Sequence, residues 1–399
     1  MKNICSEDKC YYCGACESTC KAGAISCVEN KKGFKYPIID ESICVDCAAC
    51  QRVCPVNKEI LHEETFNQQY YAAKHLDEQV RIESSSGGVF SALAEIILET
   101  GGHVYAATMD DDYIVRHICI NTAADIGLVR KSKYIQSDIV GIIKDIEADL
   151  NNNICVLFSG TPCQVSGMRR YFNGKQCTEK LLLVDFICHG VASPKIFNEY
   201  ISYIEYSRGL KVTDYIFRNK DNGWRNWNPK IILSNGENVT REYINKESYM
   251  RIYSTCMINR DSCYSCEFTS YNRNADITLG DFWNIGGIDN KLDDDKGVSE
   301  ILVNTRKGKE LFEKCKGRLY TIECTKVDVW QPHLEYPNEK PKGTKDFWLE
   351  YDSQGIGFIV GKYGKGSFVS ECKRLLLPIA RKLGLYRVAG KMYRLLFGN

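Results

Sequence analysis

The sequence predicts a mixed α/β or α+β fold, preceded by a small cysteine-rich module. Short apolar runs alternate with helical stretches between residues 70 and 304, which is typical of strands alternating with helices. The chain has 21 cysteines, and eight of them stand in two evenly spaced runs before residue 55. Since 399 residues suffice for two or three domains, we expect an N-terminal domain in residues 1–60, a central domain in residues 70–330 and a C-terminal extension in residues 331–399.

Composition narrows the class of protein. The chain has 52 basic and 51 acidic residues, so a general electrostatic attraction to nucleic acid is not expected. The first 40 residues contain no apolar signal-peptide core, and no apolar run is long enough to cross a bilayer. Many cysteines without an export signal indicate metal binding rather than disulfides. We therefore expect a cytoplasmic metalloprotein.

The two N-terminal cysteine runs share the spacing C-x2-C-x2-C-x3-C. Bacterial-type ferredoxins use this spacing to hold two [4Fe–4S] clusters, and the fourth cysteine of each run ligates the cluster of the other run. A pair of zinc ribbons is the competing interpretation, but such sites take their four cysteines as two pairs. The prediction is therefore that Cys10, Cys13, Cys16 and Cys54 hold one cluster, and Cys44, Cys47, Cys50 and Cys20 hold the other.

Some residues near these runs depart from the pattern. Lys21 stands where the first run usually has proline, a change that removes no ligand. Cys5 and Cys27 fall outside the spacing, and we expect neither to bind iron. The polar stretch 57–69 is interpreted as a linker. Other cysteines without ligand spacing are expected to be structural: Cys119, Cys155, Cys177, Cys315 and Cys324.

The central domain has recognisable elements. Residues 91–100 have helical periodicity and end at Gly101 and Gly102, whereas residues 154–158 and 181–187 are short apolar runs typical of buried strands. No G-x-G-x-x-G follows a strand and no G-x-x-x-x-G-K-[ST] occurs, so neither a Rossmann dinucleotide site nor a P-loop is supported.

Six segments of this domain together resemble the beta subunits of coenzyme F-420 hydrogenases and dehydrogenases. They are SSSGGVF (84–90), SKYIQS (132–137), FSGTPCQ (158–164), CHGVASP (188–194), SCYSCEF (262–268) and DITLGDFW (276–283). The resemblance spans most of residues 70–305, with the blocks in the family's order. It implies a non-Rossmann flavin-binding α/β domain that holds FAD beside an iron–sulfur cluster and exchanges a hydride with a substrate.

The resemblance also implies which residues hold FAD. Hydroxyl and N–H groups at the start of a helix suit a pyrophosphate, although an ordinary helix cap explains the same residues. Lys133 is expected near a flavin phosphate or the ring edge, and the loop after a buried strand is a usual ligand site. The expected FAD-binding residues are Ser84, Ser85, Ser86, Gly87, Gly88, Lys133, Tyr134, Gln136, Ser159, Gly160 and Thr161.

Four further cysteines fall in the resembling blocks. Cys163 and Cys188 follow predicted buried strands, while Cys263 and Cys266 form a C-x2-C pair. The family carries an iron–sulfur site in this domain, so the resemblance implies a third [4Fe–4S] cluster on these four. The competing interpretation is that they pack as small apolar groups, the usual fate of a free cysteine. Cys256 is the substitute ligand if Cys163 faces the flavin instead.

Three residues are candidates for catalysis. His189 follows Cys188 and is expected to donate a proton near the flavin or a hydrogen bond to a cluster sulfur, although a structural histidine is equally compatible. Lys133 and Asp281 are the others, with Asp276 and Trp283 near the mouth of the site. A basic, aromatic group is a candidate for binding an anionic or sugar-bearing substrate, with a solvated loop as its alternative: Arg218, Lys220, Trp224, Arg225 and Trp227.

The expected function is that of a FAD- and [4Fe–4S]-dependent oxidoreductase. A ferredoxin or similar donor supplies single electrons, and a hydride passes to a small molecule, as in polysaccharide or other biosynthesis. The alternatives are a coenzyme F-420 oxidoreductase and a non-catalytic electron-transfer subunit of a larger complex. Residues 368–397 are basic and amphipathic, so they predict peripheral contact at the inner face of the membrane or packing on the chain itself. A homo-oligomer is also compatible.

Overall fold

A computed structural model describes residues 3–57, 66–176, 178–226, 228–240, 248–289 and 292–365. Most of the expected linker, Cys177, Trp227 and the basic segment 368–397 lie outside the described residues, so the membrane-contact prediction is not addressed. Within the described ranges, no helix is both long and apolar enough to span a membrane.

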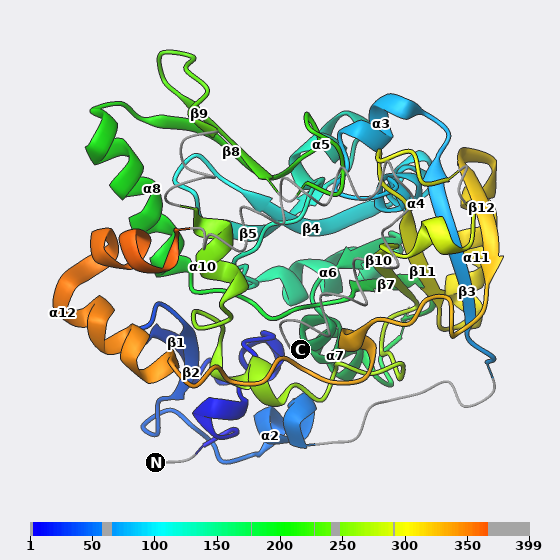
Figure 1. Ribbon diagram of the computed structural model, residues 1–399. Coiled ribbons are helices and arrows are strands. Elements are labelled where there is room, and N and C mark those ends of the chain that lie inside the picture. The colour runs from blue at the N-terminus through cyan, green and yellow to red at the C-terminus, as the bar shows by residue number, and fades with distance from the viewer. Residues whose placement is uncertain are drawn as a thin grey trace.

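An eight-stranded mixed sheet forms the centre of the molecule, in the order β12-β3-β11-β10-β7-β6-β4-β5 (Figure 1). The neighbours β10, β7, β6 and β4 run parallel, and the remaining pairs are antiparallel. This confirms the expected mixed α/β fold, and the apolar runs 154–158 and 181–187 become β6 and β7. The strands are β3 (Gln69–His75), β4 (His103–Met109), β5 (Val115–Ile120), β6 (Val156–Ser159), β7 (Leu181–Phe186), β10 (Ile277–Asp281), β11 (Ser299–Val303) and β12 (Leu319–Cys324).

Both faces of the sheet are covered because its central strands are apolar on both sides. Leu157 and Leu182 pack with α4, α5 and α11 on one face, and Phe158 and Leu183 pack with α6 and α7 on the other. The predicted helix 91–100 is α4. The helices on the two faces are α4 (Val89–Glu99), α5 (Ile126–Val129), α6 (Ile142–Asn151), α7 (Pro162–Phe172) and α11 (Arg306–Cys315), and a short helix, α3 (Glu78–Ile82), follows β3.

A second lobe joins a hairpin to three helices in one aromatic-rich core. Its elements are α8 (Pro194–Arg208), β8 (Val212–Asn219), β9 (Asn228–Leu233), α10 (Tyr249–Ser254) and α12 (Thr344–Tyr363). Phe347 and Val360 of α12 are buried in this core. The described part of the chain after residue 330, expected as an extension, is therefore packed into the body of the protein.

The N-terminal module has the ferredoxin-like architecture that the cysteine spacing predicts. It consists of a hairpin, β1 (Ile25–Glu29) and β2 (Lys35–Ile39), and two short helices, α1 (Ala15–Thr19) and α2 (Ala49–Val53). Both helices pack against α7. Cys13 and Ala15 are buried in the same apolar cluster as α6 and α7, so the module is continuous with the main core.

Gly167 on α7 permits this close approach of the module. A Cβ on Gly167 would lie 2.7 Å from the Sγ and 2.8 Å from the Cβ of Cys13, closer than atoms can pack. We expect Gly167→Ala to displace the module at a cost of about 1–3 kcal/mol, lowering the midpoint of anaerobic thermal unfolding.

The control is Gly361→Ala on α12, where an added Cβ meets no described atom within 4 Å. Its expected effect is neutral or a gain of up to about 1 kcal/mol. Equal unfolding midpoints for Gly167→Ala and the wild type would contradict the tight packing of module on helix.

Candidate redox site

The structure gathers the cysteines of the predicted first cluster around one cavity. Cys10, Cys13, Cys16 and Cys54 all line it, with Cys54 arriving from the end of α2. The crossed assignment requires this arrangement of Cys54 for the first cluster. Cys5 and Cys27, which are not expected to bind iron, line the same cavity.

The cysteines of the second cluster lie nearer the surface. Burial raises the pKa of Cys50, and Cys20 and Cys47 contribute to the shift. Cys20 and Cys50 pack against the same apolar cluster. Cys47 is exposed and Cys44 is half-buried. The backbone N–H of Ala24 donates to the Sγ of Cys20 at 3.3 Å, a kind of hydrogen bond that tunes cluster potentials.

The third group of predicted ligands also converges. Cys163 at the start of α7, Cys188 after β7, and Cys263 and Cys266 line one cavity. Burial raises the pKa of Cys188 and of Cys266, and the nearby Cys163 adds to both shifts. Cys256, the substitute ligand, does not line this cavity.

A separate group of possible metal ligands lies elsewhere in the described residues. One ligand atom from each of His103, Cys119 and Asp149 lies within 4.8 Å of the other two. None of these residues belongs to the three predicted cysteine groups.

A buried cation stands beside the third group. Arg273 lines the cavity with a side chain that is 1% exposed, and its Nε and Nη2 have no hydrogen-bond partner among the described residues. Its Nη1 lies 3.6 Å from Asp185, which is equally buried. The two donors without a partner, Nε and Nη2, and the positive charge of the guanidinium suit the negative charge of a thiolate-bound cluster.

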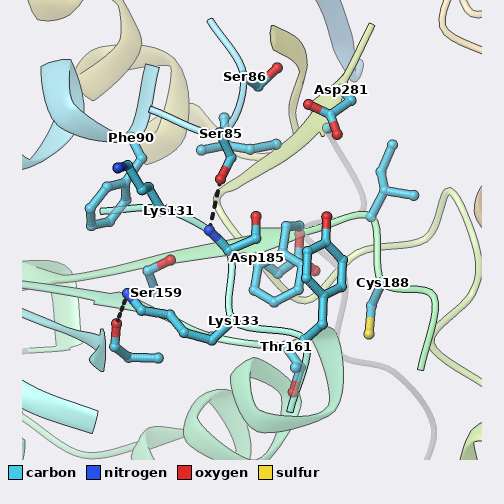
Figure 2. A pocket seen from close by; sticks show the side chains of 18 of the residues that line it. Ser85, Ser86, Phe90, Lys131, Lys133, Ser159, Thr161, Asp185, Cys188 and Asp281 are labelled. Carbon is cyan, nitrogen blue, oxygen red and sulfur yellow. Dashed lines mark hydrogen bonds between the residues drawn. The ribbon is translucent and has the colours of Figure 1, made fainter. Parts of the chain in front are cut away.

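A cavity of about 570 Å³ opens at the carboxyl ends of β6, β7 and β10 (Figure 2). This edge of a parallel sheet is the usual ligand site of α/β proteins, and the volume is within the roughly 300–1,000 Å³ typical of cofactor pockets. The lining includes most of the predicted FAD and catalytic residues: Ser84, Ser85, Ser86, Gly88, Lys133, Tyr134, Ser159, Gly160, Thr161, His189 and Asp281.

Two predicted residues face elsewhere. Gly87 packs so closely against β3 and β11 that an added Cβ would lie 2.4 Å from the carbonyl oxygen of Ala73. The amide of Gln136 donates to the carbonyl of Tyr11 and accepts from Arg260. Neither residue lines the cavity, so the structure does not bring them together with the other residues expected to bind FAD.

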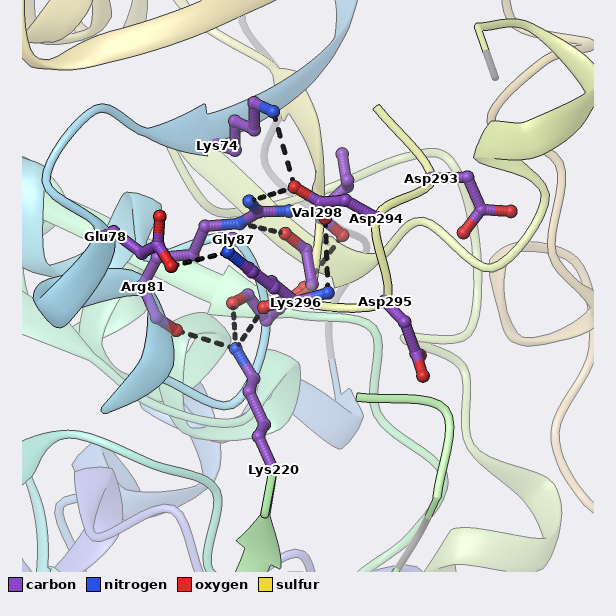
Figure 3. Close-up of polar contacts among 12 residues, drawn as sticks. Lys74, Glu78, Arg81, Gly87, Lys220, Asp293, Asp294, Asp295, Lys296 and Val298 are labelled. Atoms are coloured by element: carbon purple, nitrogen blue, oxygen red, sulfur yellow. Dashed lines mark hydrogen bonds and ion pairs between the residues drawn. The ribbon is translucent and has the colours of Figure 1, made fainter. Parts of the chain in front are cut away.

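The serine loop before α4 can receive a phosphate. Gly88 at its end has φ of 88°, and within the described structure no side chain caps the helix. The first N–H groups of α4 are therefore available to an anion. Figure 3 shows how the loop is held: the Lys220 ammonium donates to the carbonyls of Arg81, Ser86 and Lys296 at 2.7–2.8 Å.

Lys133 brings a titratable charge to the cavity. Its Nζ donates to the carbonyls of Ala107 and Arg130, each at 2.7 Å. Burial is the main cause and the neighbouring Lys131 the lesser cause of a pKa lowered to about 7. A small environmental change therefore switches this charge near neutral pH.

Two members of the predicted basic, aromatic group, Arg218 and Trp224, are buried, and two more, Lys220 and Arg225, are half-buried. Arg218 is buried and pairs with Asp281 at 2.8 Å, while buried Trp224 stacks on Trp283 with centroids 4.7 Å apart. Arg225 alone of the described members lines the cavity, as does Trp283. Asp276, expected at the mouth, is buried in a structural network with Arg169 and Thr305.

His189 meets a residue from the C-terminal part of the chain. Its ring centroid lies 4.0 Å from that of His333, and its carbonyl accepts from Asn338 at 2.8 Å. Burial lowers the pKa of His189 to about 4, and His333 adds to the shift. The His189 ring is therefore neutral at physiological pH.

Sequence reasoning missed three charged residues of the site. Asp185 lines the large cavity, Arg273 lines the third cysteine cavity, and Arg260 lies between that cavity and the module. Asp185 had a signal, since it is the one charge in the apolar run 181–187. The two arginines stand in irregular segments without periodicity, so nothing local marked them.

The cavities are contiguous. Tyr11 lines both the first and the third cysteine cavity, and Cys188, His189, Gly190 and Val191 line both the third cavity and the large one. Redox groups in these positions would be neighbours, from the module to the large cavity. Fold and site together define an iron–sulfur electron-transfer protein.

Comparison with known proteins identifies the family. Models of the coenzyme F420 hydrogenase/dehydrogenase beta subunit match at residues 70–144 for the N-terminal part and 155–327 for the C-terminal part, and a 4Fe-4S dicluster domain matches at residues 9–58. The chain belongs to the family of coenzyme F420 hydrogenase/dehydrogenase beta subunits and carries a 4Fe-4S dicluster domain.

Two relatives are informative by name. A subunit of the F(420)H(2) dehydrogenase of Methanosarcina mazei is 23% identical over 372 residues, which cover 88% of this chain and 94% of the relative. A chain of the F420-reducing [NiFe] hydrogenase complex from Methanosarcina barkeri is 18% identical, with a TM-score of 0.46 and coverage of 75% of this chain and 92% of the other.

Replacing Arg260 generates the second prediction. Its guanidinium donates to the carbonyls of Cys10 and Lys35 and to Gln136, at 2.6–2.9 Å. Lysine keeps the charge but cannot reproduce this fork, so Arg260→Lys leaves buried acceptors unpaired at a cost of about 2–4 kcal/mol. Anaerobic thermal unfolding with iron analysis measures the loss.

The control is Arg116→Lys, because Arg116 is half-exposed and pairs with Asp110 on the surface. A surface pair contributes about 0–1 kcal/mol. If the two variants unfold at the same temperature and retain the same iron, Arg260 does not fasten the module to the body.

Proposed function

We propose that the chain transfers electrons between the two clusters of its module and FAD in the large cavity, as a subunit of a coenzyme F420 hydrogenase- or dehydrogenase-type complex. The observation that carries the proposal is the contiguity of the three cavities, which share Tyr11 at one junction and Cys188 to Val191 at the other. The M. mazei relative, named as part of an F(420)H(2) dehydrogenase, supports coenzyme F420 as the two-electron partner.

The proposed groups fit the residues present. Clusters transfer one electron at a time, and FAD when bound would supply the exchange between single electrons and a hydride. The third cluster would be held by Cys163, Cys188, Cys263 and Cys266. The N–H groups at the start of α4 and Lys133 would hold the phosphates of FAD.

The chain's own residues prepare the large cavity. Asp281 is fixed on both carboxylate oxygens, by Arg218 at 2.8 Å and by the Trp224 indole N–H at 3.3 Å. These two contacts fix the position of the Asp281 carboxylate. They also fix the stacked rings of Trp224 and Trp283 beside the cavity. The neutral ring of His189 can donate a hydrogen bond from one ring nitrogen and accept a proton at the other, at the boundary with the third cavity.

The second cluster is the proposed entry and exit point for electrons. Cys47 is exposed, and Val45 beside it has 72% of its surface exposed. An apolar, accessible edge at a redox centre suits docking of a partner protein. A partner at this edge would exchange electrons with the second cluster, whose cysteines are less buried than those of the first.

The direct test is turnover of purified, cofactor-loaded protein without other subunits. With a one-electron reductant, we expect loss of the visible absorption of oxidised coenzyme F420, and no reduction of unrelated carbonyl or alkene substrates. The organic-substrate reductase predicted from sequence would be favoured by the reverse pattern. Failure with every acceptor, with full cofactor content, would leave an electron-transfer subunit whose catalytic site is on another chain.

The third cluster yields a separate prediction. Cys263→Ala removes one of its four ligands, so we expect a loss of about four irons per chain while the eight of the module remain. Cys256→Ala is the matched control, because Cys256 is close in sequence but outside the cavity. Equal iron in both variants and the wild type would argue that these cysteines are ordinary buried thiols.

FAD binding is expected to depend on pH through Lys133. Its ammonium is charged below and neutral above a pKa of about 7, so attraction to an anionic phosphate weakens as pH rises through that value. We expect Lys133→Met to weaken FAD binding roughly ten-fold, about 1.4 kcal/mol, at pH values below 7 and to have less effect above. Fluorescence titration of flavin-free protein measures the affinity.

Lys133→Arg is the matched variant, because guanidinium remains charged over the whole range. Its FAD affinity should be flat between about pH 6 and pH 8. The same pH dependence in the wild type, Lys133→Met and Lys133→Arg would show that another group is responsible.

A further inference from the structure

The first cluster cavity contains more thiols than a cubane needs. A [4Fe–4S] cluster takes four cysteine ligands, but six cysteines line this cavity: Cys5, Cys10, Cys13, Cys16, Cys27 and Cys54. The spacing assigns four of them as ligands. The remaining two, Cys5 and Cys27, have no role in that assignment.

Cys5 is close to two of the assigned ligands. It lines the same cavity as Cys10 and Cys54, and it packs against the apolar cluster that contains buried Cys54. Those two residues come from opposite ends of the module, one before α1 and the other after α2. Cys5 therefore stands beside the place where the two runs meet at the first cluster.

The segment that carries Cys5 is fastened there by hydrogen bonds. The side-chain amide of Asn57 donates to the carbonyls of Ile4 and Gln51, both at 3.1 Å, and the amide of Gln51 donates to the carbonyl of Asn3 at 3.0 Å. Ile4 is buried with Ile25 and Cys54 in one apolar cluster. The position of Cys5 is thus set by the fold of the module.

We propose that Cys5 is a reserve ligand of the first cluster, able to bind the iron that Cys10 or Cys54 otherwise holds. The exchange moves no electrons. The Cys5 thiol releases its proton to water as its S–Fe bond forms, and a displaced thiolate takes up a proton as its own S–Fe bond breaks. The proposal depends on the dicluster module and is independent of FAD, the third cluster and coenzyme F420.

Cys27 is the matched control within the same cavity. Its thiol faces the Glu17 carboxylate, with the sulfur 3.9 Å from Oε2. It offers a thiol of similar burial that, unlike Cys5, is not packed against the apolar cluster that contains Cys54. A general effect of surplus thiols would appear at Cys27 as well as at Cys5.

The test replaces ligands by alanine in the full chain and counts iron after anaerobic purification. Cys54→Ala and Cys10→Ala should keep the first cluster, whereas the same changes combined with Cys5→Ala should lose about four irons. Cys13→Ala should lose about four irons even with Cys5 present, because Cys13 is enclosed against Gly167 on the far wall. Loss of the first cluster in both Cys54→Ala and Cys10→Ala, including failure to recover folded protein, overturns the proposal.

A second measurement uses variants that keep all eight assigned ligands. In air-exposed protein with a chelator, Cys5→Ala should lose iron from the first cluster several-fold faster than the wild type, while Cys27→Ala should match the wild type. Electron paramagnetic resonance of the reduced protein follows the cluster independently of activity. Equal rates of iron loss in all three proteins would contradict a reserve ligand.

Discussion

The arrangement of the redox centres depends on the hydrogen bonds that the buried guanidinium of Arg260 donates. It is fully buried and donates to the backbone of the first cysteine run at Cys10, to the hairpin of the module at Lys35, and to Gln136 of the central domain. It also lies over the ring of Tyr36, 4.0 Å from its centroid. One planar cation thereby fixes three segments that are far apart in sequence, which a compact ammonium could not do.

The second constraint is the parallel part of the sheet. Because β6, β7 and β10 run in the same direction, the loops that follow them meet at one edge. For this reason, residues that follow or end three different strands reach the large cavity: Ser159 to Thr161, Cys188 with His189, and Asp281. Cys163 and Cys188 come from the same loops, so the third cysteine group lies against the large cavity. The contiguity of the two sites follows from strand direction.

Much of this arrangement was predictable from local patterns. The two cysteine runs specify the module, and apolar runs locate β6, β7 and α4, because these signals depend on neighbours in sequence. Contacts between distant segments left no such trace. Arg218 and Trp224 were expected to bind substrate or to lie in a solvated loop, because nothing in the sequence reveals that Asp281 accepts from both. Gln136 was expected at the flavin for the same reason, since its contacts with Tyr11 and Arg260 are set by the tertiary fold.

The proposed electron path needs three clusters and one flavin in the same chain. The first quantities to measure are iron, acid-labile sulfide and FAD per chain in anaerobically purified protein. We expect about twelve irons, about twelve sulfides and one FAD. About eight irons and no flavin would leave only the ferredoxin-like module, and would contradict both the third cluster and the flavin cavity.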